Sequence, residues 1–135
     1  MIIRRFEDIE AWQIARELAK QVYVVSAQGS FRRDYSLKDQ INRAAGSAMD
    51  NTAEGFDGGS SSEFIRFLGY AQRSCLEVQS QLYRALDRGH IDQKAFSDLY
   101  DLTNQARSKI GGFIKYLKSC RRQPRTKNQE PDNSP

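Results

Sequence analysis

Apolar residues recur along this chain at intervals of three and four, the spacing that places them on one side of an α-helix. The pattern predicts helices over about residues 9–27, 36–54, 62–88 and 92–120. A chain of 135 residues with one continuous helical pattern forms one domain with a modest single core. We therefore expect an all-α fold in which residues 1–120 form a bundle of four helices.

The expected helix boundaries carry residue types that satisfy free backbone groups. Asp8 and Asp92 are placed to cap the first and fourth helices. Ser36 followed by Asp39 has the form of a capping box for the second helix. Gly55 stands where a left-handed residue is expected, so we expect the second helix to stop there.

Polar side chains are interspersed with small ones at the centre of the chain. The second predicted helix is rich in Ala, Gly and Ser, so its axis is expected to approach its neighbours closely. Asn51 and Glu54 lie three residues apart near its end, and Ser74 and Glu77 repeat that spacing on the third helix. If the two helices are antiparallel neighbours, these side chains form a polar network that must be almost fully hydrogen-bonded. The two glutamates are then interior carboxylates with a structural role.

These central motifs resemble a known family. The run RAAGSAMDNTAEG (43–55), the segment EFIRFLGYA (63–71) and the Ser74/Glu77 pair are similar to proteins of the 23S rRNA intervening-sequence type. Relatives of that family include the accessory variability determinant (Avd) proteins of diversity-generating retroelements. The resemblance covers roughly residues 6–118. The loop between the two motifs reads Asp-Gly-Gly-Ser here instead of the family's Gly-Arg-Arg-Ser, which weakens the case for a nucleic-acid contact there.

The resemblance has consequences for fold and assembly. It implies an up-down-up-down antiparallel four-helix protomer that assembles as a homopentameric ring. In retroelement relatives the accessory protein works with a reverse transcriptase and template RNA. Whether this chain belongs to a retroelement or to an rRNA intervening sequence is left open, and neighbouring genes would distinguish the two.

The third predicted helix presents three different faces when its residues are placed at about 100° intervals. One face is apolar and belongs to the core. A second carries a stripe of arginines: Arg66, Arg73, Arg84 and Arg88. A third contains Ile65, Leu76 and Tyr83, together with two glutamines. Exposed apolar rows mark contact surfaces, so this third stripe predicts self-association; the alternative is that these are scattered exposed side chains.

Positive charge is concentrated near the C-terminus. Residues 1–101 hold 13 Lys/Arg and 15 Asp/Glu, whereas residues 102–135 hold 8 Lys/Arg and 2 Asp/Glu. Such a local excess is typical of a surface that binds a polyanion. The cations expected to neutralise phosphates are Arg107, Lys115, Lys118, Arg121 and Arg122, with the arginine stripe secondary. The polar, Pro-containing segment 121–135 is expected to be disordered.

Catalytic and cofactor chemistry is not indicated by the sequence. His90 is the only histidine and follows a glycine in a predicted turn, with no orienting partner near it in the sequence. Cys75 falls on an apolar face and is expected to be a small core residue. We expect no catalytic residues, metal or cofactor. Without an apolar run long enough for a membrane span or an export signal, the protein is expected to be cytoplasmic.

Two functional hypotheses follow. The first is a non-catalytic, oligomeric nucleic-acid-binding protein that recognises RNA or DNA by charge and shape, as an accessory to a reverse transcriptase or in association with rRNA intervening sequences. The second is a protein-interaction scaffold with no direct nucleic-acid contact. Binding that weakens steeply with added salt separates the first from the second.

Overall fold

The computed structural model describes residues 3–122, with side chains up to residue 120. Its four α-helices are α1 (Glu10–Ser26), α2 (Tyr35–Asp57), α3 (Ser61–Asp87) and α4 (Gln93–Arg122). Two 3-10 turns, η1 (Phe6–Asp8) and η2 (Gly29–Arg33), precede α1 and α2. No strand is present among these residues, so the prediction of an all-α fold with four helices is confirmed.

The predicted tail, residues 121–135, lies almost wholly outside the described residues. Only the backbone of residues 121–122 is described, and it continues α4. The expectation that residues 123–135 are disordered stays a prediction.

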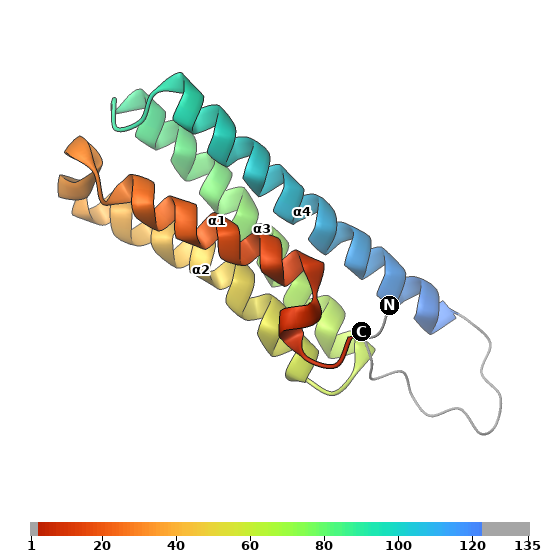
Figure 1. Cartoon of the computed structure of the whole chain (residues 1–135). Helices are drawn as coiled ribbons and strands as arrows, with labels where there is room; N and C mark the ends of the chain where they lie inside the picture. The colour runs from red at the N-terminus through yellow and green to blue at the C-terminus, as the bar shows by residue number, and fades with distance from the viewer. Residues whose placement is uncertain (1–2, 123–135) are drawn as a thin grey trace, which may run out of the picture.

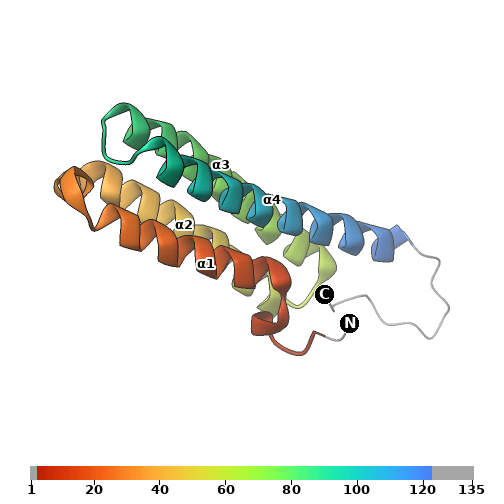
Figure 2. The same ribbon diagram turned by 45° about the horizontal axis from the view of Figure 1, so that its top comes forward.

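The four helices lie side by side (Figures 1 and 2). α1 and α3 each pack on both α2 and α4, so α3 has one face shared with α2 and another shared with α4. We call these surfaces the α2–α3 face and the α3–α4 face. The turns joining α1 to α2 and α3 to α4 lie at one end of the bundle, and the turn joining α2 to α3 lies at the other (Figure 1).

Two hydrophobic clusters fill the interior. One includes Phe31, Leu37 and Leu82, and the other includes Phe64 and Ile110. Burying large apolar side chains in this way supplies most of the free energy that holds helices together.

Cys75 lies in the second of these clusters and is fully buried. Its prediction as a core residue is confirmed. Burial raises the pKa of the Cys75 thiol to about 11, so the side chain stays protonated and inert at neutral pH.

Helix capping agrees with the sequence at some ends and not at others. The Asp92 carboxylate accepts a first-turn backbone N–H of α4 at 2.8 Å, as predicted. α2 is capped by Asp34 rather than by Ser36, which lies within the first turn. Asp8 does not cap α1: the N-cap position belongs to Ile9, and the Asp8 carboxylate instead accepts backbone N–H groups that precede it.

Gly55 does not end α2, contrary to the sequence prediction. The helix continues to Asp57, and the left-handed glycine is Gly59, with φ of +88°. Gly55 is buried against α3, where a Cβ atom would lie 2.9 Å from both Phe64 Cδ1 and Phe67 Cβ. The glycine is therefore needed for the close approach of α2 and α3.

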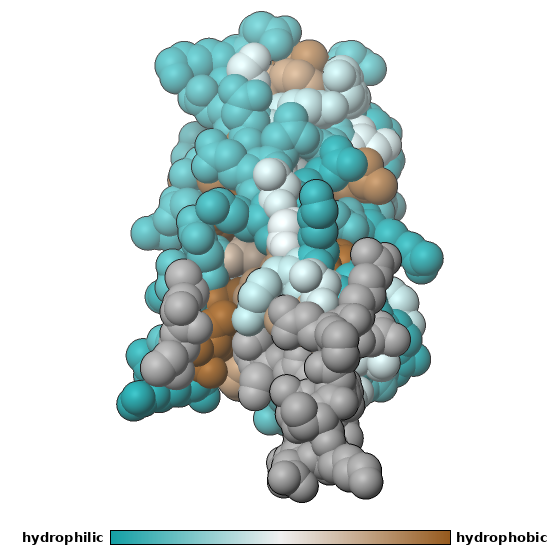
Figure 3. All heavy atoms as spheres, turned by 90° about the vertical axis from the view of Figure 1, so that its right-hand side faces the viewer, coloured by the Kyte–Doolittle hydropathy of each residue, from teal (hydrophilic) through white to brown (hydrophobic). Residues whose placement is uncertain are grey.

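The side of the molecule seen in Figure 3 is mostly hydrophilic, with a hydrophobic strip exposed among the polar side chains. A hollow of about 480 Å³ lies between α1 and α4, with Ile3, Phe113 and Tyr116 among its lining residues. The Lys109 ammonium and the Glu10 carboxylate form an ion pair at 2.9 Å across the two helices. This hollow is separate from both faces of α3.

Candidate nucleic-acid interface

A row of hydrogen bonds joins α3 to α4 on the α3–α4 face. Gln79, only 4% exposed, donates its amide N–H to Asn104 Oδ1 at 2.8 Å. Its amide oxygen accepts a hydrogen bond from Arg107 Nη1 at 2.9 Å. A buried amide that is fixed at both ends thus orients the guanidinium of Arg107 at the edge of the helix pair.

Aromatic rings occupy the same face nearer the α3–α4 turn. The Tyr83 ring packs against Phe96 at a centroid distance of 4.8 Å and against Tyr100 at 5.9 Å. Phe96 and Tyr100 also pack on each other, at 5.4 Å. Tyr83 is nevertheless 51% exposed, so this packing leaves about half of the side chain open to solvent.

Cations without partners lie at the opposite end of the face. Lys115 and Lys118 are exposed, and neither forms an ion pair or hydrogen bond with another described residue. By the rise of an α-helix, Lys115 is about 12 Å beyond Arg107 along α4. Arg73 on α3 is likewise exposed and unpaired within residues 3–120. The side chains of Arg121 and Arg122 lie outside the described residues.

Three of the four predicted arginines on α3 are engaged within the subunit. Arg66 forms an ion pair with Glu63, and its guanidinium lies 5.4 Å from the centroid of the Phe67 ring. Arg84 donates a hydrogen bond to Gln40 at 2.9 Å. Arg88 forms an ion pair with Asp34, the N-cap residue of α2. The stripe predicted from the sequence therefore contains structural contacts as well as free charge.

The third stripe of α3 is divided by the fold. Ile65 is partly buried against the second core cluster. Tyr83 packs on aromatic rings of α4 in its own subunit, as described above. Leu76 is 50% exposed and is the member left as a free aliphatic side chain.

The structure brings together only half of the predicted central network. Asn51 donates to the backbone oxygen and the hydroxyl of Ser47, at 2.9 and 2.8 Å, and Ser74 donates to the Ser47 hydroxyl at 2.9 Å. Glu54 and Glu77 are exposed and form no hydrogen bond with another described residue, so their prediction as interior carboxylates is wrong. The three-residue spacing shows only that these side chains share one side of a helix, and it does not tell whether that side is buried or lies at the exposed edge of two packed helices. Ser47 was missed, although it lies one turn before Asn51 on the same side.

A polar hollow of about 380 Å³ borders this network on the α2–α3 face. Its lining residues are Gln40, Arg43, Ala44, Ser47, Ser74, Glu77 and Gln81. Gln81 Oε1 is buried and has no hydrogen-bond partner within the part of the chain that the structure describes. A buried acceptor without a donor costs free energy, so this hollow suits a donor supplied from outside the subunit.

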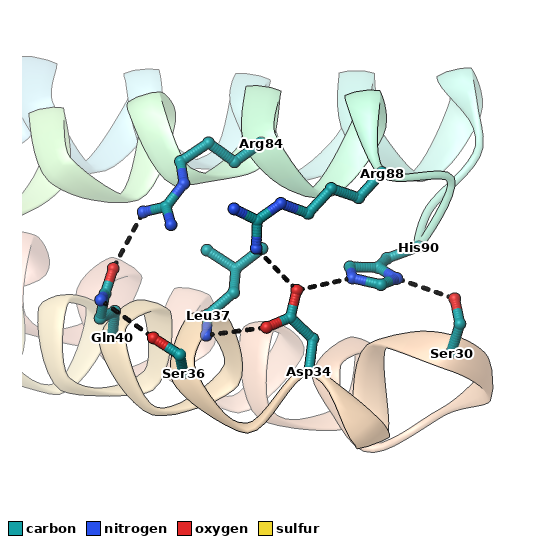
Figure 4. Close-up of polar contacts among 8 residues, drawn as sticks. All are labelled: Ser30, Asp34, Ser36, Leu37, Gln40, Arg84, Arg88 and His90. Carbon is teal, nitrogen blue, oxygen red and sulfur yellow. Dashed lines mark hydrogen bonds and ion pairs between the residues drawn. The ribbon is translucent and has the colours of Figure 1, made fainter.

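His90 belongs to a cluster that joins the two turns at one end of the bundle (Figure 4). Asp34 accepts hydrogen bonds from Arg88 at 2.8 Å and from His90 Nε2 at 2.9 Å, and its other oxygen accepts the Leu37 backbone N–H at 3.3 Å. His90 Nδ1 is 2.8 Å from the Ser30 hydroxyl. The hydrogen bonds from His90 and Arg88 hold the pKa of Asp34 at about 2.

This cluster has the residue types of a hydrolytic triad but not its electrostatics. Arg88 shares the carboxylate oxygen that faces His90, and this reduces the negative charge that would stabilise a protonated imidazole. The cluster is better explained as a clamp between turns. Local spacing in the sequence could not reveal this cluster, because His90 lies 56 residues from Asp34 and 60 from Ser30.

Neither a metal site nor a membrane helix is indicated in the described part of the chain. Residues 3–120 contain no group of three or more His, Cys, Asp or Glu side chains that could hold a metal ion. None of the described helices is both long and apolar enough to span a bilayer.

In the part of the chain that the structure describes, fold and surface together define a small all-α bundle of four helices with unpaired cations on the last helix. The chain belongs to the family of 23S rRNA-intervening sequence proteins, whose model matches residues 7–112. The matched span ends before Lys115.

The chain shares its fold with a solved structure. It is a crystal structure of a protein of unknown function from the S23 ribosomal protein family of Bacteroides thetaiotaomicron, with a TM-score of 0.71 and 18% sequence identity. The alignment covers 78% of this chain and 98% of that one. No curated protein matches the chain.

Proposed function

We propose that this protein is a non-catalytic nucleic-acid-binding protein that recognises RNA or DNA through charge and shape. The observation that carries the proposal is the pair of exposed lysines, Lys115 and Lys118, which no acidic side chain neutralises within the described chain. Lysines that are already paired within a protein gain little from a phosphate, whereas unpaired ones release counterions from the nucleic acid. Arg107 and Arg73 extend the same cationic surface across α3 and α4.

The proposal includes self-assembly into a ring. The family resemblance implies a homopentamer of up-down-up-down bundles, and a ring would present the cations of every copy on one object. The hollow on the α2–α3 face supports a contact there, because neither Gln81 Oε1 nor the Glu77 carboxylate has a partner among the described residues. A side chain from a different surface of a second copy would make a heterologous contact, the kind that closes rings.

The proposal extends to the cellular setting. We place the protein in the cytoplasm, working either beside a reverse transcriptase and its template RNA or with the transcript of an rRNA intervening sequence. Both settings supply a nucleic acid that the cationic surface would bind.

The test is a titration of labelled RNA at rising salt with wild-type protein and a Lys115→Gln/Lys118→Gln double variant. Each phosphate contact contributes about 0.7 to 0.9 to the slope of log affinity against log salt, so the double variant should lower that slope by about 1.5. A matched control is Arg32→Gln/Arg33→Gln, which removes the same charge from exposed, unpaired positions at the other end of the bundle. The control should leave the slope nearly unchanged.

Absent or salt-insensitive binding would instead favour the protein-interaction scaffold. The observation in favour of that alternative is Leu76, an aliphatic side chain that is half exposed on α3. Equal slopes for the two double variants would mean that binding is a general effect of net charge, and the proposed site on α4 would be wrong.

A further inference from the structure

The α3–α4 face changes character along its length, and this order carries an inference that rests on the proposed function. It begins with the half-exposed Tyr83 near the α3–α4 turn, continues with the Arg107 guanidinium and ends with Lys115 and Lys118. Aromatic and cationic groups are the two components of surfaces that bind single-stranded nucleic acids.

Tyr83 has the properties of a stacking platform. Phe96 and Tyr100 hold its ring from within the subunit, at centroid distances of 4.8 and 5.9 Å. The side chain remains 51% exposed, so an aromatic surface is presented to solvent in a fixed orientation. A platform that is already ordered loses little conformational entropy when a base stacks on it.

Arg107 lies close enough to serve the same nucleotide chain. Its partner Gln79 is four residues before Tyr83 on α3, one helical turn or about 6 Å along the axis. The hydrogen bond to Gln79 uses Nη1, and no other Arg107 contact with a described side chain competes for the remaining N–H groups. A guanidinium held in this way can donate to a phosphate oxygen without being reordered first.

The charges along the α3–α4 face favour one path for the bound chain. Asp87 is exposed, has no ion pair with a described residue, and follows Tyr83 by one turn on the side away from Arg107. The Asp87 carboxylate disfavours a phosphate beside it, whereas Arg107, Lys115 and Lys118 attract phosphates toward the end of α4. The favoured path therefore leads from Tyr83 over Arg107 to the end of α4.

We propose that the α3–α4 face binds single-stranded nucleic acid, with an unpaired base stacked on Tyr83, a phosphate bound by Arg107 and the following phosphates bound by Lys115 and Lys118. A duplex keeps its base faces stacked inside the helix and has none to offer Tyr83. The surface therefore distinguishes single strands from duplexes of the same charge.

The experiment compares a fluorescently labelled oligouridine with an RNA duplex of half its length, which carries the same total number of phosphates, using wild-type, Tyr83→Leu and Tyr83→Phe proteins. Leucine keeps apolar packing against Phe96 and Tyr100 but offers no ring, whereas phenylalanine keeps the ring. One base–aromatic stack is worth about 1–3 kcal/mol, so Tyr83→Leu should weaken oligouridine binding by about 5-fold to 150-fold. Tyr83→Phe should bind within about twofold of wild type, and duplex binding should be the same for all three proteins.

The outcomes distinguish a failure of the stacking inference from a failure of the proposed function. If Tyr83→Leu leaves oligouridine binding unchanged, or if the duplex binds as well as the single strand, the stacking inference is overturned while the salt dependence carried by the lysines still stands. If no RNA binds at low salt, both proposals fail. If Tyr83→Leu weakens duplex and single strand equally and Tyr83→Phe does not restore binding, the residue supports the fold of the face and is not a platform.

Discussion

Gly55 shows how a single missing side chain controls the packing of two helices. A Cβ atom on Gly55 would lie 2.9 Å from both Phe64 Cδ1 and Phe67 Cβ of α3. Phe64 belongs to the second core cluster and Phe67 Cβ is bonded to the α3 backbone, so neither atom can move away freely. Gly46 lies on the same helix, where an added Cβ would meet nothing within 4 Å. The two glycines therefore offer a matched pair.

Gly55→Ala should destabilise the protein by about 1–3 kcal/mol, the usual cost of forcing extra volume into a packed interior. Gly46→Ala should have the opposite sign and stabilise it by up to about 1 kcal/mol, because alanine favours helix more than glycine does. Urea unfolding followed by circular dichroism measures both. A Gly55→Ala protein as stable as wild type would show that α2 and α3 can separate at no cost.

The turns at one end of the bundle are joined by charge rather than by apolar packing alone. Asp34 caps α2 and at the same time binds Arg88 and His90, which flank the α3–α4 turn (Figure 4). The His90 ring also stacks on Phe31, at a centroid distance of 5.1 Å. One carboxylate thus links two loops that are distant in sequence.

This link predicts a pH dependence. The pKa of Asp34 falls from its ordinary value of 3.8 to about 2 in the folded protein, so its charge stabilises the fold above about pH 4 and that contribution is lost as the pH falls toward 2. Asp34→Asn keeps an N-cap acceptor but removes the charge. It should lower the thermal midpoint at pH 6, and the difference from wild type should shrink by pH 3.

The control for that variant is Asp50→Asn, which alters an exposed aspartate of α2 with no partner in residues 3–120. It should follow the wild-type curve at both pH values. A deficit for Asp34→Asn that is equal at pH 6 and pH 3 would assign the effect to lost packing and not to charge.

Local signals in the sequence located the helices, and contacts between distant segments account for the errors. Asp92 was interpreted correctly, because a capping interaction involves only the next few residues. Gly55 was misinterpreted, because its role is set by phenylalanines of the following helix. Ser36 was predicted to cap α2, but Asp34 is the cap. The other partners of Asp34, Arg88 and His90, follow the C-terminal end of α3 and are more than 50 residues away in the sequence.

The candidate interface was also predictable only where it depends on local sequence and not on contacts between helices. Charge counts located Lys115 and Lys118 correctly on the outside of α4, and their exposure agrees with that expectation. No periodicity distinguishes Arg73, which has no partner among the described residues, from Arg88, which is paired, because both belong to the same predicted stripe. The support of Tyr83 by rings of α4 also depends on how the two helices meet.

The proposed self-assembly would contribute most to the affinity of the proposed cationic surface. A single protomer offers a few phosphate contacts, which are weak at physiological salt. Several protomers on one nucleic acid would bind with a higher effective concentration. The α2–α3 hollow is on the other face of α3 from Tyr83, so self-association there leaves the proposed binding face open.

Glu77→Lys should disrupt assembly, because it reverses the charge at the rim of the α2–α3 hollow without altering the core. The mass in solution at micromolar concentration should fall toward the 15.5 kDa of one chain. Asp101→Lys makes the same change at an exposed, unpaired position on α4 and should keep the wild-type mass. A wild-type protein that is already monomeric would contradict the ring.

The protonated, fully enclosed thiol of Cys75 has a practical consequence. Cys120, the other cysteine, is only partly covered and lies two residues beyond Lys118 on α4. A maleimide dye added to the native protein would therefore attach at Cys120 and leave Cys75 unmodified. The natural sequence thus provides a single conjugation point within one helical turn of Lys118, from which energy transfer could report the polarity of a bound strand.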